Sequence, residues 1–409
     1  GAQAGAGEEG SYFIKGGTVV NPGGQRLPNT NILIRNNRIV EMGATQNASN
    51  ADAKVIDATG KFIYPGMIDA NTSIGLTEIG AVQAMNLNDE LGDFNPHIRA
   101  LVGLNVESEI LGTTRMNGVT TVITQPSGGV ISGQAAMINT AGWTWEDLAV
   151  VRDAGLVINL PGIGGGGGRG GRGGRGGGAA NPTLAADFDQ FMATSRDYSA
   201  AREAGATKID LVYEAMRPLF KKEIPAIMPA NGESAIRAVV AFGEKWNIRV
   251  VIEGGADAWK VRKFLAEKQI PVILSSIESA PSDSVPYDQI YAQPGLLYDA
   301  GVKFAFSTGQ GTGARHVAFH AALAMAYGLN PEGALKALTI WPAEIFGADK
   351  DIGSLEKGKL ANFFIVTGDP FDLRTQVSDV FIKGRLLPPD DRHSRLYLKY
   401  KARPLPIKP

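Results

Sequence analysis

The sequence VIDATGKFIYPGMIDA, residues 55–70, marks the point where one architecture gives way to another. Two short apolar runs flank Ala58-Thr59-Gly60, and this pattern predicts a β-hairpin. After Pro65-Gly66, the run Met67-Ile68 lacks polar alternation and is bounded by glycine, which is typical of a strand buried on both faces of a parallel sheet. We therefore expect an all-β segment to end, and an α/β segment to begin, near residue 65.

The two ends of the chain both predict β-strands. Upstream, residues 32–35 and 38–40 flank Asn36-Asn37, a turn dipeptide that tolerates positive φ. Downstream, residues 360–366 and 380–383 also have strand composition and could join the N-terminal strands. The chain after residue 387 is basic and rich in proline, so we interpret 388–409 as an arm and not a domain.

The middle of the chain alternates between short buried runs and helical patterns. This alternation predicts a β/α barrel or a doubly wound sheet. Helices are expected over 233–246, 256–268 and 315–327, and an eighth strand is expected between 179 and 223. The seven strand-like runs are 67–68, 120–123, 156–159, 226–228, 250–252, 272–274 and 302–306.

Composition excludes several kinds of site. The chain has no cysteine, which rules out disulfides, thiolate nucleophiles and cysteine-bound metals, and it has only four histidines. The net charge is −1 although Arg169, Arg172, Arg175 and the tail are basic, so the remaining body is acidic. An acidic body argues against nucleic-acid binding. No apolar run is long enough to span a membrane.

Three stretches resemble the amidohydrolase superfamily, in the branch of imidazolonepropionase-like and prolidase-like hydrolases. They are 55–70, Asn117-Gly118-Val119-Thr120-Thr121-Val122, and 334–370, which includes Gly368-Asp369-Pro370. The resemblance implies a distorted TIM (β/α)8 barrel plus a composite β-sandwich formed by the N- and C-terminal segments. The barrel would occupy 65–350, and the sandwich would be built from 11–64 and 351–387. In that branch, Ile131-Ser132-Gly133-Gln134 also has a counterpart, which we interpret as part of a surface loop.

The resemblance also implies one or two divalent metals, most often zinc, at the C-terminal ends of the barrel strands. The superfamily binds them with His-x-His after the first strand, later histidines and an aspartate after the last strand. Side chains without imidazole or carboxylate cannot replace these ligands. We therefore predict that this chain has lost its metal centre and binds no such cofactor. The positions that align with ligands are Asn71, Ser73, Pro229, Gly254 and Gly309.

Other side chains could still rebuild a site. His316 and His320 are spaced i, i+4 and share a helix face, and Glu253 and Glu278 follow predicted strands. These four are weak catalytic candidates, because packing, solvated or ion-paired roles are commoner for such residues. His97 and His393 are assigned to surface or tail positions. The emptied pocket would be lined by Asn71, Ser73, Thr308 and Gln310.

The tract 164–178 is almost entirely glycine and arginine. If 156–159 is a barrel strand, this tract leaves from the barrel mouth. A flexible insertion is one interpretation, and a contact arm for a partner or an anion, through Arg169, Arg172 and Arg175, is another. RNA binding is a third, disfavoured because the tract has no interleaved aromatic residues.

Three functional hypotheses remain open. The first is a non-catalytic structural or regulatory subunit that forms a homo-oligomer, or a hetero-oligomer with an active amidohydrolase-like chain. The second is a metal-dependent hydrolase that acts on non-peptide or dipeptide C–N bonds with an unorthodox site. The third is a small-molecule binding protein that uses the emptied pocket. The small-residue start Gly1-Ala2-Gln3-Ala4-Gly5-Ala6 is typical of sequence near a signal-peptidase site, which favours export to the periplasm over a cytoplasmic location.

Overall fold

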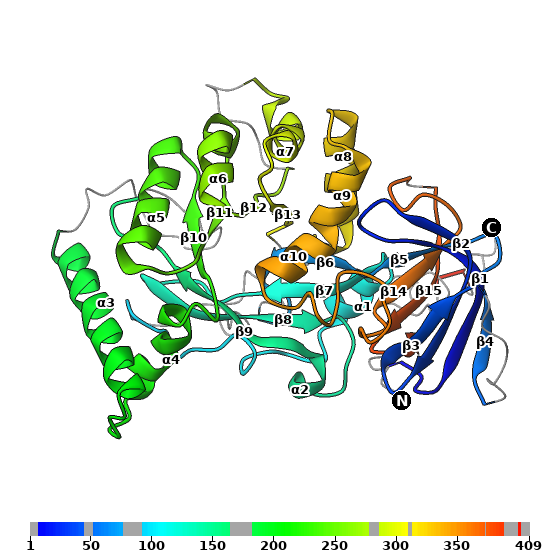
Figure 1. Cartoon of the computed structure of the whole chain (residues 1–409), viewed down its shortest axis with the longest axis horizontal. Coiled ribbons are helices and arrows are strands. Elements are labelled where there is room, and N and C mark those ends of the chain that lie inside the picture. Colours follow the sequence, from blue (N-terminus) through cyan, green and yellow to red (C-terminus); the bar gives the residue numbers. More distant parts are fainter. Residues whose placement is uncertain are drawn as a thin grey trace, which may run out of the picture.

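The computed structural model describes residues 7–44, 52–76, 92–163, 182–277, 286–309, 313–372, 374–387 and 400–401. Two separate sheets of eight strands organise these residues. A β-rich part lies at one end of the molecule, and a barrel-like sheet with its helices fills the rest (Figure 1). The predicted α/β class, with a distorted barrel and a composite β part, is confirmed. The tract 164–178 and nearly all of the basic tail lie outside the described residues.

The β-rich sheet combines strands from both ends of the chain. Its hydrogen-bonded order is β16-β15-β14-β5-β1-β2-β3, and β4 pairs with β1. The turn between β2 and β3 has the positive φ values predicted for Asn36 and Asn37, 49° and 70°. The strands are β1 (Tyr12–Val20), β2 (Arg26–Arg35), β3 (Arg38–Gly43), β4 (Lys54–Asp57), β5 (Phe62–Pro65), β14 (Phe363–Val366), β15 (Val377–Ile382) and β16 (Arg385–Leu387).

The hairpin predicted around Ala58-Thr59-Gly60 is wrong. Both β4 and β5 pair with β1 in parallel, one after the other along its length, and not with each other. The bulged region of β1 near Gly17 separates the two partners, because Ile14 faces Ile56 and Thr18 faces Phe62. The segment around Gly60, whose φ is 74°, therefore leads from one position along β1 to the next and does not form the turn of a hairpin.

The second sheet forms the barrel wall in the order β13-β12-β11-β10-β9-β8-β7-β6. Its strand pairs are parallel except at β8, which runs antiparallel to both β7 and β9. The strands are β6 (Met67–Thr72), β7 (Val119–Thr124), β8 (Ile131–Asn139), β9 (Ala149–Ile158), β10 (Ala226–Ala230), β11 (Val250–Gly254), β12 (Val272–Leu274) and β13 (Phe304–Phe306).

The eighth strand is β8, so the expectation of a strand between 179 and 223 is wrong. Every residue of β8 is buried, and the predicted surface loop at 131–134 is wrong as well. Ser132, Gly133 and Gln134 interrupt its apolar pattern and hide the strand in the sequence. The buried Gln134 amide nitrogen donates to the Pro96 and Ala215 carbonyls, at 3.3 and 3.1 Å, which offsets part of the cost of its burial.

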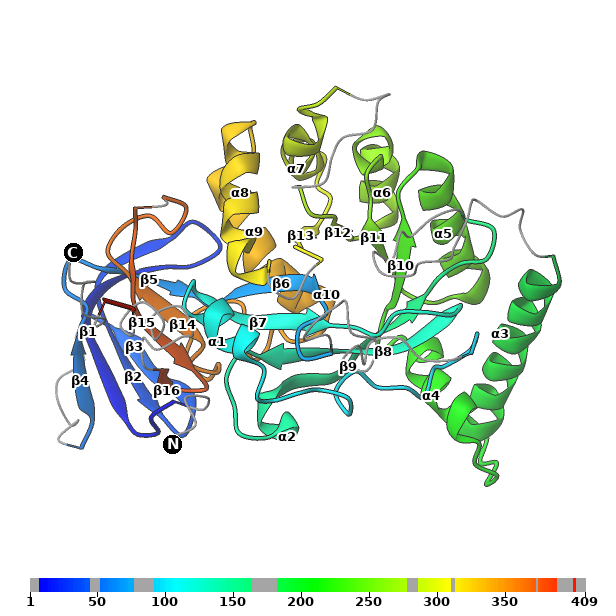
Figure 2. The same cartoon turned by 180° about the vertical axis from the view of Figure 1, so that it is seen from behind.

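Helices cover one side of the barrel strands, where α5 to α9 stand beside one another in both views (Figures 1 and 2). The helices predicted over 233–246, 256–268 and 315–327 are confirmed. Helices α3 and α4 extend away at the end opposite the β-rich part. No helix within the described ranges is long and apolar enough to cross a membrane. The helices are α1 (Glu109–Arg115), α2 (Trp145–Leu148), α3 (Pro182–Glu203), α4 (Leu211–Phe220), α5 (Glu233–Trp246), η2 (Ala258–Val261), α6 (Arg262–Lys268), α7 (Gln289–Asp299), η3 (Ala314–His316), α8 (Val317–Ala326), α9 (Pro331–Leu338) and α10 (Ile340–Ile345).

Gly66 connects the two sheets, because it lies between β5 of one and β6 of the other. Its N–H donates to the Asn362 carbonyl at 3.0 Å. A Cβ atom at this position would overlap the side chain of Thr120 in β7. Glycine is required here because the backbone at residue 66 closely approaches Thr120 of β7, and not because of a positive φ.

We predict that Gly66→Ala lowers the free energy of unfolding by about 1–3 kcal/mol, because the new methyl group must displace a buried strand. Gly43→Ala is the matched control, since a Cβ at Gly43 has no heavy atom within 4 Å. Urea unfolding of both variants checks the prediction, and equal stability of the two variants would contradict it.

Candidate functional site

Polar side chains gather at the C-terminal ends of the barrel strands, where a β/α barrel carries its functional residues. Asp69 and Asn71 lie in β6, and Gln125 follows β7 directly. Glu253 lies in β11, and Thr308 follows β13. These five residues form the mouth cluster.

Asp69 is fully buried and accepts three hydrogen bonds. The N–H groups of Asn71 and Thr308 donate to its Oδ1 at 3.2 and 3.1 Å, and the Thr308 hydroxyl donates to Oδ2 at 2.5 Å. Burial raises the pKa of Asp69 to about 7, although these three bonds act in the opposite direction. Both carboxyl oxygens are therefore already engaged by neighbouring groups of the protein.

Glu253 forms the second half of the mouth cluster. The Gln125 side-chain amide donates to Glu253 Oε2 at 2.7 Å, and the Asn71 side chain also hydrogen-bonds to this carboxyl group. Burial raises the pKa of Glu253, and the two amide contacts oppose the shift. Gln125 Oε1 is buried and has no hydrogen-bond partner among the described residues.

The five positions predicted to align with metal ligands carry no imidazole or carboxylate group. Asn71 has an amide and Ser73 a hydroxyl, and the side chains of the other three, Pro229, Gly254 and Gly309, have no atom that could bind a metal. Pro229 pairs with Glu253 across β10 and β11. Gly254 has φ of 99°, and a Cβ there would overlap Asn231. The N–H of Gly309 donates to the Asn71 carbonyl at 3.0 Å. Ser73 follows β6.

These residues do not fit a divalent ion held in the superfamily's manner, because amides, hydroxyls, proline and glycine cannot supply imidazole or carboxylate ligands. The two carboxyl groups of the mouth cluster are engaged by internal donors. Across the described ranges, three or more His, Asp or Glu side chains nowhere come together in a group that could hold a metal. The alignment of these positions with the family's ligands stays a prediction.

The three histidines within the described ranges do not form a joint site. His316 is exposed at the start of α8, where the Arg315 Nε–H donates to His316 Nε2 at 3.1 Å. His320, one turn later, is 1% exposed. Although their spacing predicts a shared helix face, His316 is exposed to solvent and His320 lies in the packed interior. His97 is exposed, as expected for a surface position.

Several candidates lie outside the described residues, namely Glu278, Gln310, His393, Arg169, Arg172 and Arg175. Of the remaining predicted residues, Asn71, Thr308 and Glu253 come together in the mouth cluster. Asp69 and Gln125 were missed by sequence reasoning. Asp69 lies inside the junction motif at 55–70, and a carboxylate in an otherwise apolar strand was the signal that could have identified it.

Comparisons with known proteins agree with this architecture. Residues 267–387 match the model of the amidohydrolase family. An amidohydrolase structure from Thermotoga maritima is 27% identical, with a TM-score of 0.80 over 92% of this chain and 99% of that chain. A Xaa-Pro dipeptidase structure, 16% identical over 92% of this chain and 99% of that chain, has a TM-score of 0.58 and shares the fold.

The adenine deaminase of Deinococcus deserti is 27% identical over 385 residues, which is 92% of this chain and 60% of the deaminase. A 5'-deoxyadenosine deaminase of Methanobrevibacter smithii is 33% identical over 84 residues, 20% of this chain and 19% of that protein. This chain thus spans less than two thirds of these curated relatives. Residues 267–387 therefore carry an amidohydrolase family domain, and the whole chain has the fold of a solved amidohydrolase.

We predict that the buried proton on Asp69 makes stability depend on pH. The ordinary pKa is 3.8 and the folded value is about 7, so between these values the folded chain keeps a proton that the unfolded chain releases. The stabilisation is complete below pH 3.8 and is lost as the pH rises to about 7. The expected slope is on the order of 1.4 kcal/mol per pH unit.

Urea unfolding across this pH window checks the prediction with two variants. Asp69→Asn should remove this part of the slope, whereas Asp197→Asn, whose side chain is 71% exposed, should retain it. An unchanged slope in Asp69→Asn would show that the carboxyl group of Asp69 is not the titrating group.

Proposed function

We propose that this chain is a non-catalytic member of the superfamily, a structural or regulatory subunit that pairs with an active amidohydrolase-like chain. The observation that carries the proposal is the internally bonded mouth cluster. Glu253 is held by two side-chain amides, and Asp69 by three donors from β6 and the segment after β13. A hydrolytic site needs carboxylate lone pairs directed at a metal, a water molecule or a substrate.

The energetics of the mouth cluster support a structural role. A buried carboxyl group is costly when ionised, and protonation together with hydrogen bonds removes most of that cost. The raised pKa values of Asp69 and Glu253 agree with such a cluster. The bonds also join β6 to β11 and to the segment after β13, and they join β11 to the segment after β7, which holds the barrel wall together at its mouth.

Metal retention tests the proposal directly. The full chain is incubated with excess zinc, dialysed against zinc-free buffer and analysed by mass spectrometry for bound metal, beside an authentic zinc enzyme as control. We expect well below one equivalent of zinc per chain, because the aligned positions lack imidazole ligands. One retained equivalent that protects against thermal unfolding would overturn the proposal.

A second candidate function, a hydrolase of C–N bonds, is favoured by Glu253 alone. A carboxyl group whose pKa burial raises is a candidate general acid or base, and Gln125 Oε1 beside it is unpartnered among the described residues. The superfamily relatives named as a dipeptidase and an adenine deaminase suggest dipeptides and adenine as first substrates.

We predict that Glu253→Gln keeps the fold and that wild type and variant alike lack turnover of dipeptides, cyclic amides and adenine. The replacement amide has nearly the same shape and removes a buried ionisable group. Glu356→Gln, whose side chain is 61% exposed, is the control for handling. Turnover by the wild type that Glu253→Gln abolishes, while Glu356→Gln preserves it, would favour the hydrolase over the subunit.

A further inference from the structure

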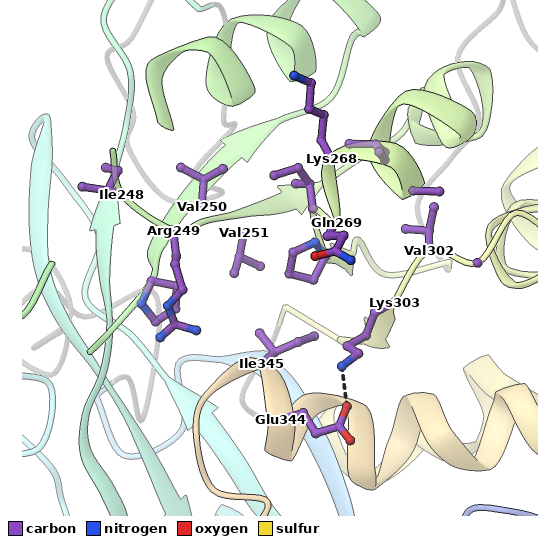
Figure 3. A pocket seen from close by; sticks show the side chains of 16 residues that line it. Ile248, Arg249, Val250, Val251, Lys268, Gln269, Val302, Lys303, Glu344 and Ile345 are labelled. Carbon is purple, nitrogen blue, oxygen red and sulfur yellow. Dashed lines mark hydrogen bonds and ion pairs between the residues drawn. The ribbon is translucent and has the colours of Figure 1, made fainter. Parts of the chain in front are cut away.

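A cavity of about 680 Å³ lies at the end of the barrel opposite the mouth cluster. Part of its lining directly precedes or begins the strands β10 to β13, and the rest comes from α6, the residues after it and α10. The mouth cluster, in contrast, lies where strands end. Figure 3 shows the cavity from close by, with side chains from the β11 and β13 segments and from α10 around it. The volume lies within the range of small-molecule sites in proteins.

Arg249, just before β11, is the distinctive polar residue of this cavity. Its Nε donates to the Lys222 carbonyl at 3.0 Å and its Nη2 to the Glu223 carbonyl at 3.1 Å. These two bonds fix the plane of the guanidinium group. Its Nη1 has no acceptor within the described part of the chain, and no described carboxylate pairs with it. Arg249 as a whole is exposed, and desolvation by the cavity wall lowers the pKa of its guanidinium.

The other cations of the cavity are already neutralised. Lys303 is ion-paired with Glu344 of α10, which Figure 3 marks with a dashed line. Lys268 binds Glu244 at 2.6 Å and extends away from Arg249 and Lys303. The lining therefore carries one uncompensated positive charge, at Arg249.

The rest of the lining supplies apolar surface and one amide. Gln269 follows α6, where φ of 54° turns the chain, and its side-chain amide lies beside the cavity (Figure 3). The apolar lining residues include Pro225, Val251, Pro271, Val302 and Ile345. A ligand that fits must therefore combine an apolar body with a single anionic group.

We propose that this cavity binds a small monocarboxylate with an apolar body, and that the Arg249 guanidinium anchors its carboxylate. A guanidinium held flat by backbone carbonyls is well suited to a planar carboxylate. A doubly charged phosphoryl group would leave one negative charge without a partner. This assignment goes beyond the proposed function, because it does not depend on whether the barrel mouth is catalytic.

Calorimetric titration of the full chain with hexanoate tests this site. We expect saturable binding of hexanoate and much weaker binding of acetate, which lacks the apolar body, and of hexanol, which lacks the charge. Hexanol binding as tightly as hexanoate, or no saturable hexanoate binding at all, would overturn the proposal. Tighter binding of hexylphosphonate would overturn the choice of a carboxylate.

Two variants locate the binding site. Arg249→Gln should weaken hexanoate binding at least tenfold, and the surface control Arg374→Gln, with a side chain 89% exposed, should leave binding unchanged. Because Arg249 also holds two carbonyl groups, Gln269→Glu provides a second test that spares those bonds. This variant adds a negative charge beside the ligand and should also weaken binding. Unchanged affinity in both Arg249→Gln and Gln269→Glu would place hexanoate elsewhere and overturn the proposal.

Discussion

Hydrogen bonds centred on one buried carboxyl group, that of Asp69, join the two edge strands of the barrel wall at its mouth. β6 and β13 stand at opposite ends of the hydrogen-bonded strand order and share no ladder. Asp69 of β6 accepts both the N–H and the hydroxyl of Thr308, and the next N–H, that of Gly309, donates to the Asn71 carbonyl. These three hydrogen bonds, donated by Thr308 and Gly309, take the place of a backbone ladder between β6 and β13. The carboxyl group tolerates its burial because each of its oxygens meets a donor.

A second set of polar contacts fastens the barrel to the β-rich sheet. Asp147 of α2 binds Arg385 at 2.6 Å and also contacts Lys383, and these basic side chains are 11% and 16% exposed. Burial alone would raise the pKa of Asp147, but the contacts with Arg385, Trp143 and Lys383 lower it. Asn362 donates to Asn139 of β8 at 2.8 Å. Directional bonds fix an orientation that apolar packing alone leaves adjustable.

The sequence allowed prediction where local pattern and tertiary environment agree. The junction at 55–70, the Asn36-Asn37 turn and the amphipathic helix α5 have that property. Prediction failed at β8, because the Gln134 amide nitrogen binds the carbonyls of Pro96 and Ala215, which are distant in sequence. It also failed at β4 and β5, because the turn motif between them predicts a hairpin and gives no sign that both strands pair with β1. At the mouth, Glu253 was recognised from its place after a buried run, but Gln125 acquires its role only from the meeting of separate strands.

The reversed strand β8 also bears on the order in which the chain folds. Because it runs antiparallel between β7 and β9, the segment 119–158 forms a meander of sequence neighbours, whereas β9 meets β10 only after the chain has passed through α3 and α4. Contacts that close short loops cost less chain entropy and form sooner than distant ones. The meander is thus suited to serve as the nucleus on which the parallel strands assemble, and pulse-labelled amide exchange during refolding should find β8 protected before β12. Protection of β12 first would assign the nucleus to the parallel half.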